Sequence, residues 1–264
     1  MFKNLRNAYK YRALIQSLVV RELKARYRGS VLGFFWSFLN PLLLLLVYTV
    51  VFTFFLPQRG AMDEIQPYAL FLFTGLLPWT WFSTSLLESA SVMSVNANLI
   101  QKILFPAEVL PFVNVFTNLC HFVLGLPILF AFLIIFSKPF LPYLFLFPLI
   151  MLIQMIFTLA LTLLISSLSV HFRDIRDILA NLLTLWFFTT PIIYPIQIMD
   201  NSKLRFLFDL NPMTHIVLAY QDVLYHGRLP SMLKLSCMAL FSIIAFLICY
   251  AIFDRLRDTF AEEV

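Results

Sequence analysis

Residues 139–172 read PFLPYLFLFPLIMLIQMIFTLALTLLISSLSVHF and contain no Asp, Glu, Lys or Arg. A helix that crosses a bilayer needs about 20 mostly apolar residues, so this stretch is long enough to be one. Each of the other stretches that lack charge is far longer than the roughly 10-residue strand of an outer-membrane barrel. The sequence therefore predicts an all-α polytopic membrane protein. Its six transmembrane helices are expected in the charge-free stretches 29–58, 65–87, 109–137, 139–172, 178–199 and 235–253.

The composition supports a membrane protein. Hydrophobic residues make up 61% of the chain and charged residues 12%, whereas soluble domains contain about 45–50% and about 25%. Intrinsic disorder is excluded because it requires few apolar residues and much charge. The cysteines Cys120, Cys237 and Cys249 are an odd number and lie in apolar runs, so we expect no disulfide framework.

The basic residues predict the orientation. The first 28 residues contain eight Lys or Arg and one acid, Glu22. Across the six expected spans, thirteen basic residues fall on the side of the termini and five on the other side. Because Lys and Arg beside spans are retained in the cytoplasm, both termini are predicted to be cytoplasmic in a multi-pass protein of the cytoplasmic (inner) membrane. The apolar run from Gly33 is too long for a cleaved signal peptide.

The expected domain organisation has three parts. Residues 1–32 form a cytoplasmic amphipathic interface helix, residues 33–254 form the transmembrane domain, and residues 255–264 form a cytoplasmic tail. Within the domain, the spans are expected at about 33–56, 67–88, 109–136, 141–170, 177–199 and 231–253.

Residues 9–28 have the pattern of a helix that lies in the membrane plane. Two interpretations are open: a positive flank that orients the first span, or an interface helix that docks a cytoplasmic partner. Gly29 and Gly33 fit either close helix packing or the end of this helix. The expected apolar face consists of Tyr11, Leu14, Ile15, Leu18, Val19 and Leu23.

Two further segments between spans have helical signals. Residues 94–106 contain a short amphipathic pattern, which is either a simple connector or a docking element. Between the fifth and sixth spans, Asn211 is an expected N-cap, Pro212 the first helical residue and Gly227 the stop signal. This second helix is too short to cross, and it can enter the membrane only where its backbone is buried in protein or lines a cavity.

Several chemistries are missing from the sequence. No glycine is followed by lysine, so the phosphate-binding G-x-x-x-x-G-K-[ST] loop is absent and the chain is not expected to hydrolyse ATP by itself. No H-E-x-x-H or C-x-x-C motif occurs, so no metal site is predicted. The central turns of the spans carry almost no charge, which argues against coupling to an ion gradient. No filter motif of a passive channel is present.

Aromatic residues are the remaining signal, with 30 Phe, 10 Tyr and 4 Trp. Most of them are expected to face lipid or to pack between helices. A second interpretation is that aromatic rings of the first and fifth spans line a path for a polymer, because ring faces bind weakly at many places. The residues chosen for this path are Tyr48, Phe52, Trp186, Phe187 and Tyr194.

Six segments together resemble one known family. They are ELKARYRGSVLGFFWSFLNPLL (22–43), LLPWTWFSTSL (76–86), NANLIQKILFPAEVLP (96–111), VHFRDIRDI (170–178), TPIIYP (190–195) and LNPMTHIVLAYQDVLY (210–225). In this order, they resemble the permease subunits of type-2 ABC exporters. More narrowly, they resemble the branch that exports lipid-linked polysaccharides, such as O-antigen and teichoic acid.

The resemblance implies partners for this chain. It implies a homodimer that binds two copies of a cytoplasmic ABC ATPase, with ATP and Mg²⁺ on that subunit and no cofactor in this chain. The implied substrate is a glycan linked to undecaprenyl diphosphate, and nucleic acid is not an expected partner. An exporter of drugs or small amphiphiles is the alternative within transport. An intramembrane enzyme of lipid or glycan synthesis is the alternative from another class, supported only by His121 and Glu88.

The resemblance also implies site residues. Arg26 and Arg28 are candidates for binding the substrate pyrophosphate, because a guanidinium fork fits phosphate and keeps its charge; a role as membrane anchors is the other interpretation. External gate helices are expected between the fifth and sixth spans, with Pro212, His215 and Tyr220 as candidates. The ATPase contact is expected at Leu99, Ile100, Gln101, Lys102, Ile103 and Leu104.

Overall fold

A computed structural model of the chain describes residues 11–26, 28–51, 65, 67–101, 105–172, 174–199, 205–257 and 260. Every regular element within these residues is a helix, as the sequence predicts. The elements are α2 (Arg12–Arg26), η1 (Gly33–Phe35), α3 (Trp36–Val50), α4 (Tyr68–Val95), α5 (Ala97–Ile100), α6 (Val109–Ile135), η4 (Leu141–Leu146), α7 (Phe147–His171), α8 (Ile175–Phe188), η5 (Ile196–Met199), α9 (Arg205–Leu210), α10 (Pro212–Gln221), η6 (Asp222–His226) and α11 (Met232–Leu256).

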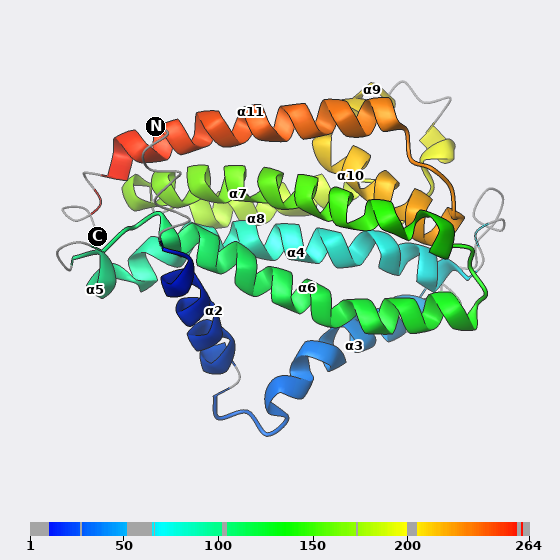
Figure 1. Cartoon of the computed structure of the whole chain (residues 1–264), viewed down its shortest axis with the longest axis horizontal. Helices are drawn as coiled ribbons and strands as arrows, with labels where there is room; N and C mark the ends of the chain where they lie inside the picture. Colours follow the sequence, from blue (N-terminus) through cyan, green and yellow to red (C-terminus); the bar gives the residue numbers. More distant parts are fainter. Residues whose placement is uncertain are drawn as a thin grey trace.

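The long helices lie side by side along one axis (Figure 1). In the described part of the chain, four helices are long and apolar enough to cross a membrane: α4, α6, Leu141–His171 and α11. We call the end of the bundle with α2, α5 and the last turns of α11 the α2 end, and the end with η4 and η6 the η6 end. Helix α2 is steeply inclined to the bundle axis at the α2 end.

The helix of the fifth expected span is shorter than the sequence suggested. Helix α8 ends at Phe188 instead of continuing to residue 199, because Pro191 and Pro195 lack an N–H and disfavour helical geometry in the residues before them. The described part of the first apolar stretch is helical over Trp36–Val50, and residues 52–56 lie outside the described residues.

Helix α4 is longer than expected. It continues past residue 88 to Val95, because its last turns also have a face to bury. Met93 on this extension packs with Leu163 of α7 and Tyr250 of α11.

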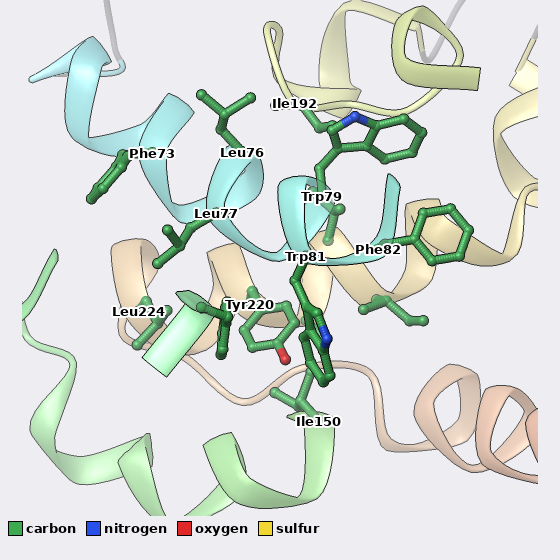
Figure 2. Packing of buried hydrophobic residues seen from close by; sticks show 14 of the residues in the cluster. Phe73, Leu76, Leu77, Trp79, Trp81, Phe82, Ile150, Ile192, Tyr220 and Leu224 are labelled. Carbon is green, nitrogen blue, oxygen red and sulfur yellow. The ribbon is translucent and has the colours of Figure 1, made fainter. Parts of the chain in front are cut away.

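Helix α4 is buried on nearly every side and forms the centre of the fold (Figure 2). Its aromatic side chains pack against α7 through Phe82 and Phe157, and against α6 through Trp81 and Phe122. The close approach of α6 to α4 depends on Gly125 of α6. A Cβ at this position would lie 2.6 Å from a methyl group of Leu77 on α4.

The apolar face of α2 is covered by α6. Leu18 and Val19 are buried against Val109 and Val113 at the start of α6, and the other residues of the expected apolar face pack around them. After α2, Gly29 and Gly33 both have positive φ angles, of 79° and 50°. No atom lies within 4 Å of the position of a Cβ at either glycine, so this pair marks a turn rather than a close helix contact.

Helix α10 is inserted among α4, α7 and α11. Met213, Ile216, Val217 and Tyr220 have no exposed surface. The expected cap is present, since Oδ1 of Asn211 accepts the N–H of Met213 at 3.0 Å. The helix continues through the π-helical turn η6 and stops at Gly227, which has the left-handed φ of 59°.

Asn211 also joins α10 to the end of α8. Its Oδ1 accepts the indole N–H of Trp186 at 2.7 Å, and its Nδ2 donates to the backbone oxygen of Thr189 at 2.9 Å and to Oγ1 of Thr190 at 3.0 Å. Because Asn211 is buried, loss of its amide would leave several polar groups without partners.

The η6 end contains a compact group of charges. Nε of Arg228 donates to Oδ1 of Asp222 at 2.7 Å, and the ammonium of Lys138 lies 3.9 Å from the ring centroid of Tyr225. His226 packs edge-on against Tyr225, with ring centroids 5.1 Å apart. Burial, together with the charges of Arg228 and Lys138, lowers the pKa of His226 from 6.5 to about 4.

We predict that Asn211→Ala destabilises the fold by about 2 kcal/mol, because a helix cap and a buried side-chain network are lost together. The matched control is Asn181→Ala on α8, whose exposed amide donates to the backbone oxygen of Asp177. Thermal unfolding of the purified protein, followed by tryptophan fluorescence, measures both. Equal shifts in the two variants would contradict a special role for Asn211.

A second prediction concerns pH. A histidine with a lowered native pKa is neutral in the folded protein but binds a proton when the protein unfolds. Its contribution to the free energy of unfolding is therefore complete above pH 6.5 and is lost as the pH falls towards 4. His226→Phe should therefore flatten the fall of the melting temperature between pH 6.5 and 4. Asp222, whose pKa is raised by burial, remains in both proteins and cancels in the comparison. If the melting temperature of His226→Phe falls with pH as steeply as that of the unchanged protein, His226 is not the source of this pH dependence.

Candidate functional site

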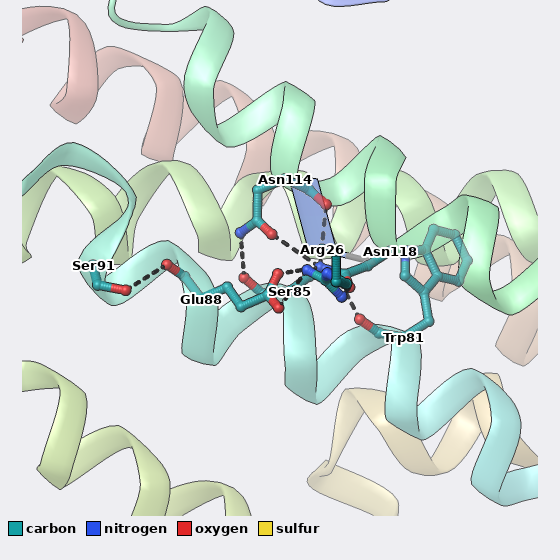
Figure 3. A network of polar contacts seen from close by, with 7 residues as sticks. All are labelled: Arg26, Trp81, Ser85, Glu88, Ser91, Asn114 and Asn118. Atoms are coloured by element: carbon teal, nitrogen blue, oxygen red, sulfur yellow. Dashed lines mark hydrogen bonds and ion pairs between the residues drawn. The ribbon is translucent and has the colours of Figure 1, made fainter. Parts of the chain in front are cut away.

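A polar network joins α2, α4 and α6 near the α2 end (Figure 3). Nη2 of Arg26 lies 2.7 Å from Oε1 of Glu88, and Nη1 donates to Oδ1 of Asn118 at 3.4 Å. Nδ2 of Asn118 donates to the second carboxylate oxygen of Glu88 at 2.7 Å. Asn114 completes the group by donating to the backbone oxygen of Ser85 at 2.8 Å.

The network explains why an acid is tolerated in an apolar helix. Glu88 is the only acid in α4, and Arg26 neutralises it. Both side chains are about one-third exposed, so solvent reduces the net stabilisation to that of a surface pair. The sequence analysis missed this pair. The available signal was Glu88 itself, because an acid within a long apolar segment requires a basic partner.

Two cavities meet at Arg26. The larger, of about 800 Å³, lies between α3, α4 and α6 and is lined by Asn40, Leu77 and Asn118 among others. The smaller, of about 240 Å³, lies under α2 and is lined by Glu88 and Asn114 among others. Arg26 lines both of them, so its side chain borders the two spaces.

Arg28, the second arginine predicted to bind pyrophosphate, is exposed in the turn that follows α2. It lines neither cavity. The structure therefore separates the two arginines: Arg26 is part of a network between three helices, and Arg28 is at the surface.

The aromatic residues predicted to line a path are half-buried where they are described. Trp186 donates to Asn211 and packs edge-on against Phe82, with ring centroids 5.2 Å apart. Phe187 packs against Trp79, and the hydroxyl of Tyr194 donates to the backbone oxygen of Phe188. Tyr48 packs against the core, and Phe52 lies outside the described residues.

The segment predicted to contact an ATPase is only partly described. Ile100 in α5 is buried and packs near Ala107 and Phe253, so this side chain has a partner within the fold. Leu99 is half-buried and Gln101 is exposed. Lys102, Ile103 and Leu104 lie outside the described residues.

The residues predicted to form an external gate have different surroundings. Tyr220 is fully buried between Phe122 and Phe147. His215 is half-buried, with Nε2 2.8 Å from the backbone oxygen of Asp209. Pro212 is half-buried at the first position of α10. Tyr220 thus holds α10 in the bundle.

His121 and Glu88, the residues offered for an intramembrane enzyme, line different cavities. Among the described residues, no group of three or more His, Cys, Asp or Glu side chains could hold a metal ion. His121 lines the larger cavity, whereas Glu88 lines the smaller one.

Comparison with known proteins identifies the family. The sequence model of the family described as ABC-2 type transporter matches residues 13–225. The O-antigen export system permease protein RfbA of Myxococcus xanthus is 45% identical over the full length of both chains. A protein of the same name from Klebsiella pneumoniae is 34% identical over 98% of this chain and 99% of its own. The polysialic acid transport protein KpsM of Escherichia coli is 22% identical over 92% of this chain and 93% of its own. This chain belongs to the ABC-2 type transporter family.

Proposed function

We propose that the chain is the membrane subunit of an ATP-driven exporter of polysaccharide linked to undecaprenyl diphosphate. The observation that carries the proposal is the 45% identity, over the whole of both chains, to an O-antigen export permease. ATP hydrolysis occurs on a separate ABC ATPase with its Mg²⁺, since this sequence lacks the phosphate-binding loop. The chain itself is a transport component and needs no cofactor of its own.

The proposal includes six spans in the cytoplasmic membrane with both termini in the cytoplasm. Helices α3 and α8 join the four long helices as the first and fifth spans, and their apolar sequences support this assignment. The basic residues of the first 28 positions support a cytoplasmic N-terminus.

A homodimer encloses the path in this proposal. Helix α8 exposes Ile178, Leu182, Leu185 and Phe188, which gives an apolar face that a second copy can cover. A glycan needs more space than six helices enclose, so two copies related by a twofold axis form the conduit. The aromatic rings at Tyr48, Phe52, Phe187 and Tyr194 contribute weak contacts along it. Trp186 positions these rings through its hydrogen bond to Asn211, which connects α8 to α10.

The two ends of the bundle have different roles in the proposal. At the α2 end, two ATPase copies contact α2 and residues 99–104, and Arg26 and Arg28 attract the diphosphate of the substrate. At the η6 end, α9 and α10 act as an external gate, with Pro212, His215 and Tyr220 fixing α10. The burial of α10 and its joint with α8 support a gate that moves as one unit with the end of the fifth span.

Loss of this chain should stop export. In cells without the gene, we expect no polysaccharide at the surface and accumulation of the lipid-linked glycan on the cytoplasmic leaflet. Inverted membrane vesicles treated with a glycosidase measure the trapped glycan, and re-expression of the gene is the control. Normal surface polysaccharide together with lost efflux of small amphiphiles would support the drug-exporter alternative and contradict the proposal.

The ATPase contact gives a separate prediction. Leu99→Asp places a charge on the half-buried side chain of α5 beside exposed Gln101, so copurification of the ATPase should fall about tenfold or more. The matched control is Leu229→Asp, which makes the same change at an exposed leucine near the η6 end. Membrane insertion should be normal in both variants. Undiminished copurification with Leu99→Asp would exclude α5 from the contact.

A further inference from the structure

The larger cavity has a polar end and an apolar end. On α4 its lining runs from Thr84, one turn from Glu88, back to Phe73, which is about 16 Å along the helix. On α3, Ser37 and Asn40 precede the apolar residues Leu44 and Val47. Because α3 and α4 are antiparallel spans, the polar residues of both lie towards Arg26 and the apolar residues lie away from it.

The charge of the lining is positive. Among the described residues that line the cavity, Arg26 is the only Lys, Arg, Asp or Glu, and Glu88 lines the smaller cavity. Arginine has five N–H donors, and Glu88 and Asn118 bind two of them. A second anion can therefore bind Arg26 from the larger cavity.

The cavity is open on the side of α3. Leu43, Leu44 and Val47 of α3 line it and are also exposed. Its volume of about 800 Å³ lies within the roughly 300–1,000 Å³ range of sites that enclose a small ligand. The surroundings match a molecule with one anionic group at the membrane boundary and an apolar chain within the bilayer.

We propose that this cavity binds a lipid phosphate, with the phosphate on Arg26 and a single hydrocarbon chain between α3, α4 and α6. Two sources share this chemistry: a phospholipid of the bilayer and the polyprenyl phosphate portion of an export substrate. Only the second source rests on the proposed function. The residues that line the cavity all belong to one copy of the chain.

Native mass spectrometry of the permease in zwitterionic nanodiscs tests the site, with undecaprenyl phosphate and phosphatidylglycerol as separate probes. Binding of undecaprenyl phosphate alone assigns the substrate as the occupant. Binding of phosphatidylglycerol, alone or as strong as the other probe, assigns a bilayer lipid. Binding of neither probe overturns the proposal. If the protein does not export glycan but still binds lipid, the proposed function is contradicted and the lipid site is retained.

Matched variants separate a binding role of Arg26 from a structural one. Arg26→Gln should weaken binding of the lipid phosphate by about tenfold or more, because a charge-assisted hydrogen bond is lost. Glu88→Gln breaks the same ion pair but keeps the guanidinium, so binding should be kept or strengthened. Equal losses in the two variants, or full binding by Arg26→Gln, would overturn the assignment of the phosphate to Arg26.

A second pair of variants tests the position of the chain. Leu44→Trp fills the cavity from α3 and should abolish binding of either lipid. Leu46→Trp is the control, because Leu46 is exposed on the same helix but does not line the cavity. If Leu44→Trp binds lipid as well as Leu46→Trp does, the hydrocarbon chain does not occupy this cavity.

Discussion

Backbone oxygens that are buried away from water need hydrogen-bond donors from the protein, and this constraint governs where the chain leaves helical geometry. The break after α8 satisfies it with side chains from elsewhere in the fold. Asn211 donates to the oxygen of Thr189, Gln221 to that of Pro191 at 3.0 Å, and the hydroxyl of Tyr68 to that of Ile193. Donors from α4 and from both ends of α10 thus hold the broken segment. The insertion of α10 into the bundle and the early end of α8 are therefore two parts of one arrangement.

Helix α4 connects this arrangement to the α2 end. Near its start, Tyr68 and Gly75 approach the break and α10; a Cβ on Gly75 would lie 3.2 Å from Nε2 of Gln221. Near its other end, Glu88 binds Arg26 of α2. A displacement of α2 would therefore act on the helix that also supports α10. Since α4 is buried along nearly its whole length, it transmits a displacement as a rigid element better than a surface helix would.

Local signals in the sequence predicted local structure well. The apolar runs, the face of α2 led by Leu18 and Val19, the cap at Asn211 and the stop at Gly227 all depend on nearby residues, and the structure contains each of them. Charge-free length alone extended the fifth helix past Phe188, because this criterion does not register Pro191.

Contacts between distant segments could not be predicted in the same way. The Arg26–Glu88 pair joins residues that are 62 positions apart, and neither residue specifies the other. Similarly, the sequence around Trp186 does not reveal that its indole N–H donates to Asn211, 25 positions away. Ile100 belongs to an amphipathic pattern, yet the fold supplies its apolar partners.

The Arg26–Glu88 pair also has a consequence for the order of assembly during synthesis. Helix α2 leaves the ribosome first, but its ionic partner is on α4 and the cover for its apolar face is on α6. Until both later segments have entered the bilayer, Leu18 and Val19 can be shielded only by lipid, and Arg26 has only water and headgroups to bind. Helix α2 is therefore made before the segments that cover it, and it reaches its final contacts only after α6 has entered the bilayer.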